Sequence, residues 1–399
     1  MHAASLWTLC LGNFVIGTGA LIVPGMLPGL AEGLDVSLPV AAQLITAFAA
    51  SVCVGAPLLA TATSRFDRRR LLAATLVLYF LGHLAAALVS SFAAMLAIRV
   101  VTAAGSALFT AQAAATAALL VAPERRGRAI AFVFLGWAVA SVVGLPLGAY
   151  VGATWGWRAG YAMVAAASLA TAAAVLLLLP HKLHVKAVDA AMWRSILGNR
   201  TILALLAVTG LFMAATFGLF SYFVPAAHAF VGASPLLVSL LLAGFGAAAV
   251  TGNLVAARFM DRVGAGNVVV LCLVAMAASH LAWPFTQGST ALLAAVMLGW
   301  GIGGFAANSG QQARLVAISP SQASVSVALN TSAVFLGQAA GTASTSALVA
   351  HIPGSAGYAA IPWITVPLLL LAIGLSVFAS LRMRSHFGSA HVQGRSAQG

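Results

Sequence analysis

The chain has 399 residues, of which 62% are hydrophobic and only 6% are charged, and its mean hydropathy is +1.05. A soluble domain of this size carries about 25% charged residues, so the composition excludes a water-soluble globular protein and predicts a polytopic membrane protein. The formal net charge is +13, but the basic residues are spread over short segments between apolar runs, so a nucleic-acid-binding surface is not expected.

Apolar segments of about 20 residues, each long enough to cross a hydrocarbon core as a helix, recur along the whole chain. The first has no basic region before it and is too long for the apolar part of a signal peptide, so it is interpreted as the first span. Twelve spans are predicted, at residues 5–28, 38–61, 71–90, 92–121, 128–152, 159–179, 202–228, 235–257, 267–286, 290–313, 323–349 and 359–381.

Lysines and arginines gather in alternate connections between these spans. Of the 19 basic residues, 17 lie in the even-numbered connections and the C-terminal tail, including the run RFDRRR at 65–70 and Arg314 between spans 10 and 11. The opposite connections hold only Arg158. Short loops rich in Lys and Arg stay in the cytoplasm, so both termini are predicted to be cytoplasmic. The arginine run is expected to anchor its loop at anionic headgroups.

The two halves of the chain repeat one another. A displacement of 197 residues superposes Gly55 on Gly252 and His83 on His280. Matches in the same spans of each half predict two pseudo-symmetric six-helix bundles related by an axis along the membrane normal. The predicted organisation is an N-terminal bundle at 1–179, a cytoplasmic linker at 180–201, a C-terminal bundle at 202–383 and a disordered cytoplasmic tail at 384–399.

Three stretches resemble motifs of the major facilitator superfamily. The loop pattern Gly-x-x-x-Asp-Arg-x-Gly-Arg-Arg is matched by Asp261-Arg262-Val263-Gly264 and, less closely, by Ser64-Arg65-Phe66-Asp67-Arg68-Arg69. The segment LAIRVVTAAG (96–105) resembles a fourth-span motif centred on an arginine, here Arg99. The segment GWAVASVVGLPLGAYVGATWGWR (136–158) resembles the fifth-span antiporter signature. The chain is thus similar to the twelve-span drug:proton antiporters, which include arabinose-type and multidrug exporters.

The resemblance implies a major facilitator fold, in which spans 1, 4, 7 and 10 line a central cavity and transport proceeds by alternating access. The glycines and proline of span 5 are expected to allow a close, bent contact with the second bundle. The two arginine-bearing loops form a cytoplasmic gate or, alternatively, only fix the topology. The predicted gating and coupling residues are Arg65, Asp67, Arg99, Gly144, Pro146, Gly148, Asp261 and Arg262.

Polar side chains in the cavity-lining spans are candidates for contact with a substrate. The alternative for each is a hydrogen bond between helices, worth about 0.6 kcal/mol on average. Arg99 lies within span 4, where a lone charge is costly, so it is expected either to bind an anionic group or to bond to carbonyls. The predicted substrate-binding residues are Asn13, Gln112, Tyr222, Asn308, Gln312 and Asn330.

Proton coupling has no obvious carboxylate. In related exporters span 1 carries an acidic residue after Gly-Thr, but this chain reads Gly17-Thr18-Gly19-Ala20-Leu21, and no Asp or Glu lies inside a predicted span. Proton relays usually rely on buried Asp, Glu or His. His83 and His280 fall in the peripheral spans 3 and 9, where polar packing is the simpler interpretation.

The predicted function is export of a small organic molecule or drug across the bacterial inner membrane, with proton antiport as the family expectation. A proton-independent facilitator or importer and a non-transporting membrane sensor are the alternatives. No cofactor, metal site or catalytic group is predicted, so an enzyme is not expected. The expected partners are a small-molecule substrate, protons and membrane lipid, but no nucleic acid, and the protein is expected to be a monomer.

Overall fold

The computed structural model describes residues 2–63, 65–122, 125–181, 198–318, 323–352 and 354–396. These residues contain helices and turns but no β-strand. The helices of the first half are α1 (His2–Gly33), α2 (Leu38–Ala62), α3 (Arg68–Leu88), α4 (Phe92–Leu119), α5 (Arg126–Val139), the π-helix η2 (Ala140–Gly144), α6 (Leu145–Trp155) and α7 (Trp157–Leu178). Those of the second half are α9 (Arg200–Phe220), α10 (Phe223–Val231), α11 (Pro235–Val263), α12 (Ala265–Ala282), the 3-10 helix η3 (Trp283–Thr286), α13 (Thr290–Ile318), α14 (Ala323–His351), α15 (Ser355–Ala360) and α16 (Pro362–Ser396).

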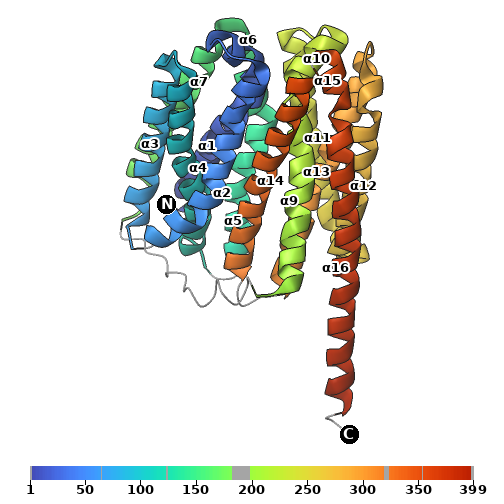
Figure 1. The fold of residues 1–399 in the computed structure, drawn as a ribbon. Helices are drawn as coiled ribbons and strands as arrows, with labels where there is room; N and C mark the ends of the chain where they lie inside the picture. The colour runs from blue at the N-terminus through green and yellow to red at the C-terminus, as the bar shows by residue number, and fades with distance from the viewer. Residues whose placement is uncertain are drawn as a thin grey trace.

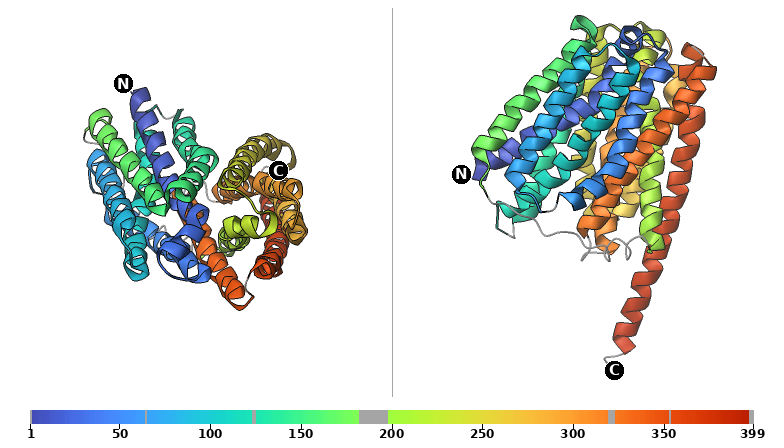
Figure 2. Two further views of the ribbon diagram at one scale, coloured as in Figure 1. Left: turned by 90° about the horizontal axis from the view of Figure 1, so that it is seen from above. Right: turned by 60° about the vertical axis from the view of Figure 1, so that its left-hand side comes forward.

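Twelve helical segments of the described residues are long and apolar enough to cross a membrane. This confirms the prediction of an all-α polytopic membrane protein. Helices α1 to α7 pack on one another as one bundle and α9 to α16 as a second (Figure 1). The two bundles lie side by side when the molecule is viewed along its helices (Figure 2).

The internal repeat reappears in the packing of small residues. A Cβ atom added at Gly144 would lie 2.0 Å from Oγ1 of Thr18 in α1. A Cβ atom added at Gly341, which lies 197 positions after Gly144, would lie 2.0 Å from the main-chain oxygen of Ala214 in α9. Within each bundle, the equivalent pair of helices therefore approaches closely at an equivalent glycine.

Two element boundaries differ from the sequence prediction, and a third region is not described. The predicted span 202–228 is divided at Ser221 and Tyr222, because Pro225 has no N–H with which to continue the helical bonding to Ser221. Helix α16 continues to Ser396 across residues predicted to be a disordered tail, and no proline after Pro367 interrupts it. Most of the predicted linker, residues 182–197, lies outside the described part of the chain.

The two ends of the bundle differ in charge. The connections that carry Arg65 and Arg125 lie at one end, as does the last turn of α11 with Arg262, and α16 projects from this end (Figure 1). This end is called the basic end. The α1–α2 turn, with Asp35, and the α6–α7 turn, followed by Arg158, lie at the opposite end. The alternation follows from the spans, since each successive helix reverses direction.

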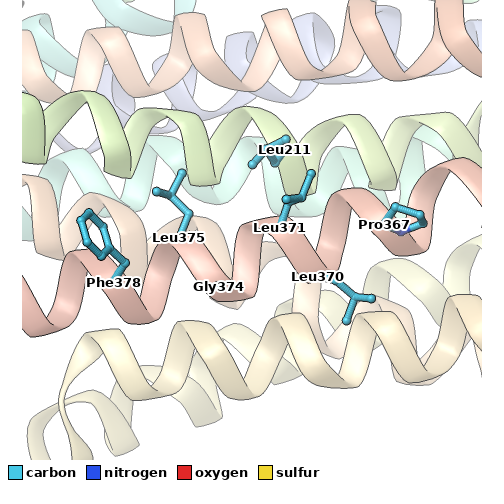
Figure 3. Close-up of a pocket in the computed structure, with 7 residues that line it drawn as sticks. All are labelled: Leu211, Pro367, Leu370, Leu371, Gly374, Leu375 and Phe378. Atoms are coloured by element: carbon cyan, nitrogen blue, oxygen red, sulfur yellow. The ribbon is translucent and has the colours of Figure 1, made fainter.

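A shallow apolar groove of about 700 Å³ runs along the outer surface between α9 and α16 (Figure 3). Its lining residues are Leu211, Pro367, Leu370, Leu371, Gly374, Leu375 and Phe378. Leu370 and Leu371 are 57% and 61% exposed. An exposed leucine surface of this kind suits acyl chains, and the groove lies within one bundle rather than between the two.

Candidate functional site

The boundary between the bundles is the candidate functional site. Helix α2 packs along α14, helix α11 packs against η2 and α6, and α1 touches α10. One buried apolar cluster joins both bundles near the opposite end, where Leu27 of α1 and Leu145 of α6 belong to the same core as Phe223 of α10. The bundles are thus sealed together by apolar contact on that side.

The contact between α2 and α14 includes a hydrogen bond. Ser332 Oγ donates to the main-chain oxygen of Cys53 at 3.2 Å. In a regular helix that oxygen would accept from the residue four positions later, which is Pro57 and has no N–H. The serine of one bundle therefore uses a carbonyl group that the helix of the other bundle cannot use.

The contact between α11 and the η2–α6 segment also includes a hydrogen bond from a serine of the second bundle to a main-chain oxygen of the first. Ser239 Oγ donates to the main-chain oxygen of Pro146 at 3.1 Å. Just before Pro146, the chain makes the π-helical turn η2, and a Cβ atom on Gly246 of α11 would lie only 2.5 Å from the main-chain oxygen of Ser141 in that turn. Gly246 thus allows α11 to approach the backbone of η2 directly.

The contact with α11 is confined to one part of the fifth span. Helix α11 packs against η2 and α6, whereas α5, which continues toward the basic end, is at most a minor partner. The apolar clusters of the second bundle near the basic end, around Leu205 and Leu315 and around Ala306, contain no residue of the first bundle among those described. Along this side, the bundles meet near the opposite end and separate toward the basic end.

The glycines of span 5 serve a different contact from the predicted one. Gly144 faces Thr18, and a Cβ atom on Gly148 would lie 2.7 Å from Ile22 Cγ1. Both positions lie against α1 within the first bundle, while the expected contact of span 5 with the second bundle is made by other residues of η2 and α6 against α11. Pro146 does reach the second bundle, through its main-chain oxygen.

Two of the predicted substrate residues form one polar group in the second bundle. Asn330 Nδ2 donates to Asn308 Oδ1 at 2.9 Å, and Thr209 Oγ1 donates to Asn330 Oδ1 at 2.8 Å. Asn330 is fully buried, whereas Asn308 and Gln312 are half-buried. The group connects α9, α13 and α14, and the half-buried Asn308 takes part in it as an acceptor through its Oδ1.

The other three candidates lie elsewhere. Asn13 Nδ2 donates to the main-chain oxygen of Val133 at 3.0 Å, and its Oδ1 is buried without a hydrogen-bond partner among the described residues. Gln112 Oε1 accepts from Arg68 at 2.7 Å, and Tyr222 donates to Ser346 Oγ at 2.9 Å. The structure therefore does not bring the six residues into one cluster.

The arginine-bearing loop before α3 leads into a capped helix N-terminus. Asp67 is the N-cap of α3, since its side chain accepts from the N–H of Arg70 at 3.1 Å. Arg68, expected at the membrane surface, is 1% exposed and bonded to Gln112. Arg65 and Arg262 are exposed. The side chain of Asp261, the other carboxylate of the predicted gate, lies outside the described part of the chain, as does Ser64.

Arg314 is not in a loop. Helix α13 extends to Ile318, and Arg314 is 3% exposed inside it. The guanidinium donates to Gln311 Oε1 at 2.9 Å, to Ser376 Oγ at 2.8 Å and to Ser380 Oγ at 3.0 Å. These bonds tie α13 to α16, so the predicted loop assignment is wrong. A span boundary placed before the charged residue ended the predicted helix too early, because Arg314 is hydrogen-bonded inside the protein.

Sequence reasoning also missed the residues that join the bundles, namely Pro57, Ser239, Gly246 and Ser332. A proline inside an apolar span signals a freed carbonyl group, so Pro57 could have been noted. The serines and Gly246 carry no such signal, since similar residues occur throughout the spans.

The described residues thus form two six-span bundles, joined along α2 and α14 and along α11 and the η2–α6 segment. Solved structures support the fold. The chain matches a bacterial homologue of the human lysosomal transporter Spinster, in an inward-facing and occupied conformation, with a TM-score of 0.76, 17% identity and coverage of 94% of this chain and 96% of that one. It matches the D-xylose-proton symporter with a TM-score of 0.71, 16% identity and coverage of 94% and 96%.

The family model of the Major Facilitator Superfamily matches residues 9–231, so the chain belongs to this superfamily of transporters and is not an enzyme. It is 29% identical over 377 residues to the inner membrane transport protein YdhP of Escherichia coli (strain K12), covering 94% of this chain and 96% of that one. It is 34% identical over 265 residues to a chloramphenicol resistance protein of Streptomyces lividans, covering 64% and 67%. These matches, with the twelve apolar helices, establish a multi-pass protein of the bacterial inner membrane.

Proposed function

We propose that this transporter exports a small, uncharged or weakly anionic amphiphile from the cytoplasm by alternating access. The observation that carries the proposal is the asymmetric contact between the bundles, in which η2 and α6 meet α11 near the opposite end while α5 diverges from it toward the basic end. The excess of Lys and Arg at the basic end supports a cytoplasmic position for that end. The contact then serves as an outer seal.

The substrate class is inferred from the polar groups near the boundary. The half-buried Asn308 and Gln312 offer neutral amides. No Asp or Glu that could attract a cation lies within a span predicted from the sequence. The similarity to a chloramphenicol resistance protein supports the same class, since chloramphenicol is an uncharged amphiphile. Proton antiport is the coupling that the resemblance to drug:proton antiporters implies.

The test is flux of labelled chloramphenicol in inside-out and right-side-out membrane vesicles, with and without an imposed pH gradient. We expect accumulation in inside-out vesicles when their interior is acidic, and loss of accumulation when the gradient is collapsed. The control is vesicles prepared from cells that lack the protein, which measure passive entry of the compound.

Each other outcome changes a specific part of the proposal. Accumulation only in right-side-out vesicles would make the protein an importer. Flux that equilibrates regardless of the gradient would make it a facilitator and remove antiport. Flux no greater than that of vesicles without the protein in either orientation would reject uncharged amphiphiles as the substrate class.

A further inference from the structure

The interior of the first bundle holds a polar cluster that the proposed transport cycle does not use. It consists of Tyr79 and His83 of α3, Arg99 of α4 and Tyr161 of α7, none of which is more than 1% exposed. The rings of Tyr79 and His83 are 4.2 Å apart, and those of His83 and Tyr161 are 5.7 Å apart. Gly19 of α1 links Arg99 to the cluster, since its main-chain oxygen accepts a hydrogen bond from Arg99 and a Cβ atom added to it would lie 2.6 Å from the Tyr79 hydroxyl and 2.7 Å from His83 Nε2.

The guanidinium of Arg99 has few hydrogen-bond partners among the described residues. Nη1 donates to the main-chain oxygen of Gly19 at 3.2 Å, and the cation lies 4.2 Å from the ring centre of Phe48. Nε and Nη2 are buried and have no hydrogen-bond partner among the described residues. Buried donors without partners are costly, and in native proteins they generally bond to an ordered water or ion when the chain supplies nothing.

A second donor in the cluster is also incomplete. The hydroxyl of Tyr161 is buried without a partner among the described residues, whereas the hydroxyl of Tyr79 donates to the main-chain oxygen of Ile16 at 3.0 Å. His83 uses Nδ1 for the main-chain oxygen of Tyr79 at 2.8 Å. The unsatisfied polar groups of the cluster among the described residues are therefore the guanidinium, one phenol and the ring atom Nε2 of His83.

The cluster also lacks a negative charge. The chain has six acidic residues, and those described in the first half are the exposed Glu32 and Asp35 of the α1–α2 turn and Asp67, which caps α3 at the basic end. None lies inside a span of the first bundle. Arg99 is therefore a buried cation without a carboxylate partner in the described bundle, and a neutral water molecule would not balance its charge.

We propose that Arg99 and Tyr161 form a buried binding site for a compact monovalent anion, either an inorganic halide or a carboxylate group. The anion accepts hydrogen bonds from Nε and Nη2 of Arg99 and from the hydroxyl of Tyr161. The site lies inside one bundle, so its occupancy stabilises that bundle and does not require transport. The inference thus goes beyond the proposed export function and is tested by a readout other than flux.

The test is thermal unfolding of the purified full-length protein in sodium gluconate, whose anion is bulky, and in sodium chloride, bromide or formate at equal ionic strength. We expect the unfolding midpoint of the wild type to rise by about 2 °C or more in a compact anion and to increase with its concentration, as binding to the folded state requires. A rise in halides alone identifies an inorganic ion. An equal rise in formate identifies a site that also accepts a carboxylate.

Two matched tyrosine variants separate an anion from ordered water. Tyr161→Phe removes a hydroxyl without a protein partner, so we expect it to lower the midpoint in chloride but not in gluconate. Tyr79→Phe removes a hydroxyl that is bonded to Ile16, so we expect the same loss in both salts. Arg99→Gln should abolish the response to chloride, and Arg99→Lys should weaken it if the glutamine variant does not fold. Equal wild-type stability in all salts, or an equal effect of Tyr161→Phe in chloride and gluconate, would overturn the proposal.

Discussion

Ser332 of α14 donates a hydrogen bond of 3.2 Å to the main-chain oxygen of Cys53 in α2, which joins the two bundles through an oxygen that Pro57 leaves without a helical donor. We expect Ser332→Ala to lower the stability of the purified protein by about 0.6 kcal/mol, the average for such bonds in membranes. Ser344→Ala is the control, because Ser344 is exposed and bonds to Ala340 of its own helix. Equal thermal unfolding of both variants would mean that the bond between the bundles contributes nothing.

Gly246 and Gly244 of α11 give a matched pair for the outer seal. A Cβ atom at Gly246 would meet the main-chain oxygen of Ser141 at 2.5 Å, whereas one at Gly244 would meet the Leu298 side chain at an ordinary 3.6 Å. Because the obstructing atom belongs to the main chain of η2, it cannot rotate away as a side chain could. Gly246→Ala should therefore lower the folding stability by about 1–3 kcal/mol and reduce transport, while Gly244→Ala should leave stability and transport unchanged. Unaltered flux in Gly246→Ala would show that this contact does not act as a seal.

The contact of Gly144 with Thr18 is open to a double-mutant test. Gly144→Ala places a Cβ atom 2.0 Å from Oγ1 of Thr18, so it should destabilise the first bundle by about 1–3 kcal/mol. Adding Thr18→Ala removes the atom that clashes, and we expect it to restore part of the loss. Strictly additive effects on the unfolding midpoint would argue that the two residues do not meet.

Arg314 is expected to be structural despite its charge. Arg314→Gln removes the bonds to Ser376 and Ser380 and so weakens the attachment of α16 to α13, at a cost of about 1.5–3 kcal/mol. Arg258→Gln is the control, because Arg258 is exposed on α11. Similar denaturation curves for the two variants would contradict the buried position of Arg314.

The orientation of the bundle can be checked by labelling single cysteines in a variant lacking Cys10, Cys53 and Cys272. In right-side-out vesicles, an impermeant maleimide should modify Ser37→Cys at the opposite end. It should not modify Arg65→Cys or Arg262→Cys, since short basic loops remain cytoplasmic. Modification of positions 65 and 262 from different sides would contradict the two-bundle topology.

Hydropathy sufficed for the twelve helices because a span needs a long apolar run, and that property is local. The same method misplaced Arg314, whose acceptors Ser376 and Ser380 lie on another helix and are invisible to a window of neighbouring residues. Likewise, glycine in span 5 predicts a close helix contact but not its partner, and the partner is Thr18 rather than the second bundle.

The polar candidates show the same limit. Residue type identified Asn308 and Asn330, which do pair, but it also selected Asn13 and Tyr222, which are engaged within separate bundles. An amide in a span is compatible with a ligand or with a neighbouring helix, and only the tertiary arrangement decides between them. The gate stays a prediction, because Asp67 caps α3 and the side chain of Asp261 lies outside the described part of the chain.

The close approach of α1 to the fifth span has a mechanical consequence. Gly136, Gly144, Gly148 and Gly152 lie against Cys10, Thr18, Ile22 and Met26 over the length of both segments. This row of contacts resists sliding of α1 along the fifth span, because an axial shift would move side chains into the space beside a glycine that only a hydrogen atom can occupy. A motion that separated Pro146 from Ser239 would therefore carry α1 (His2–Gly33) along with the fifth span.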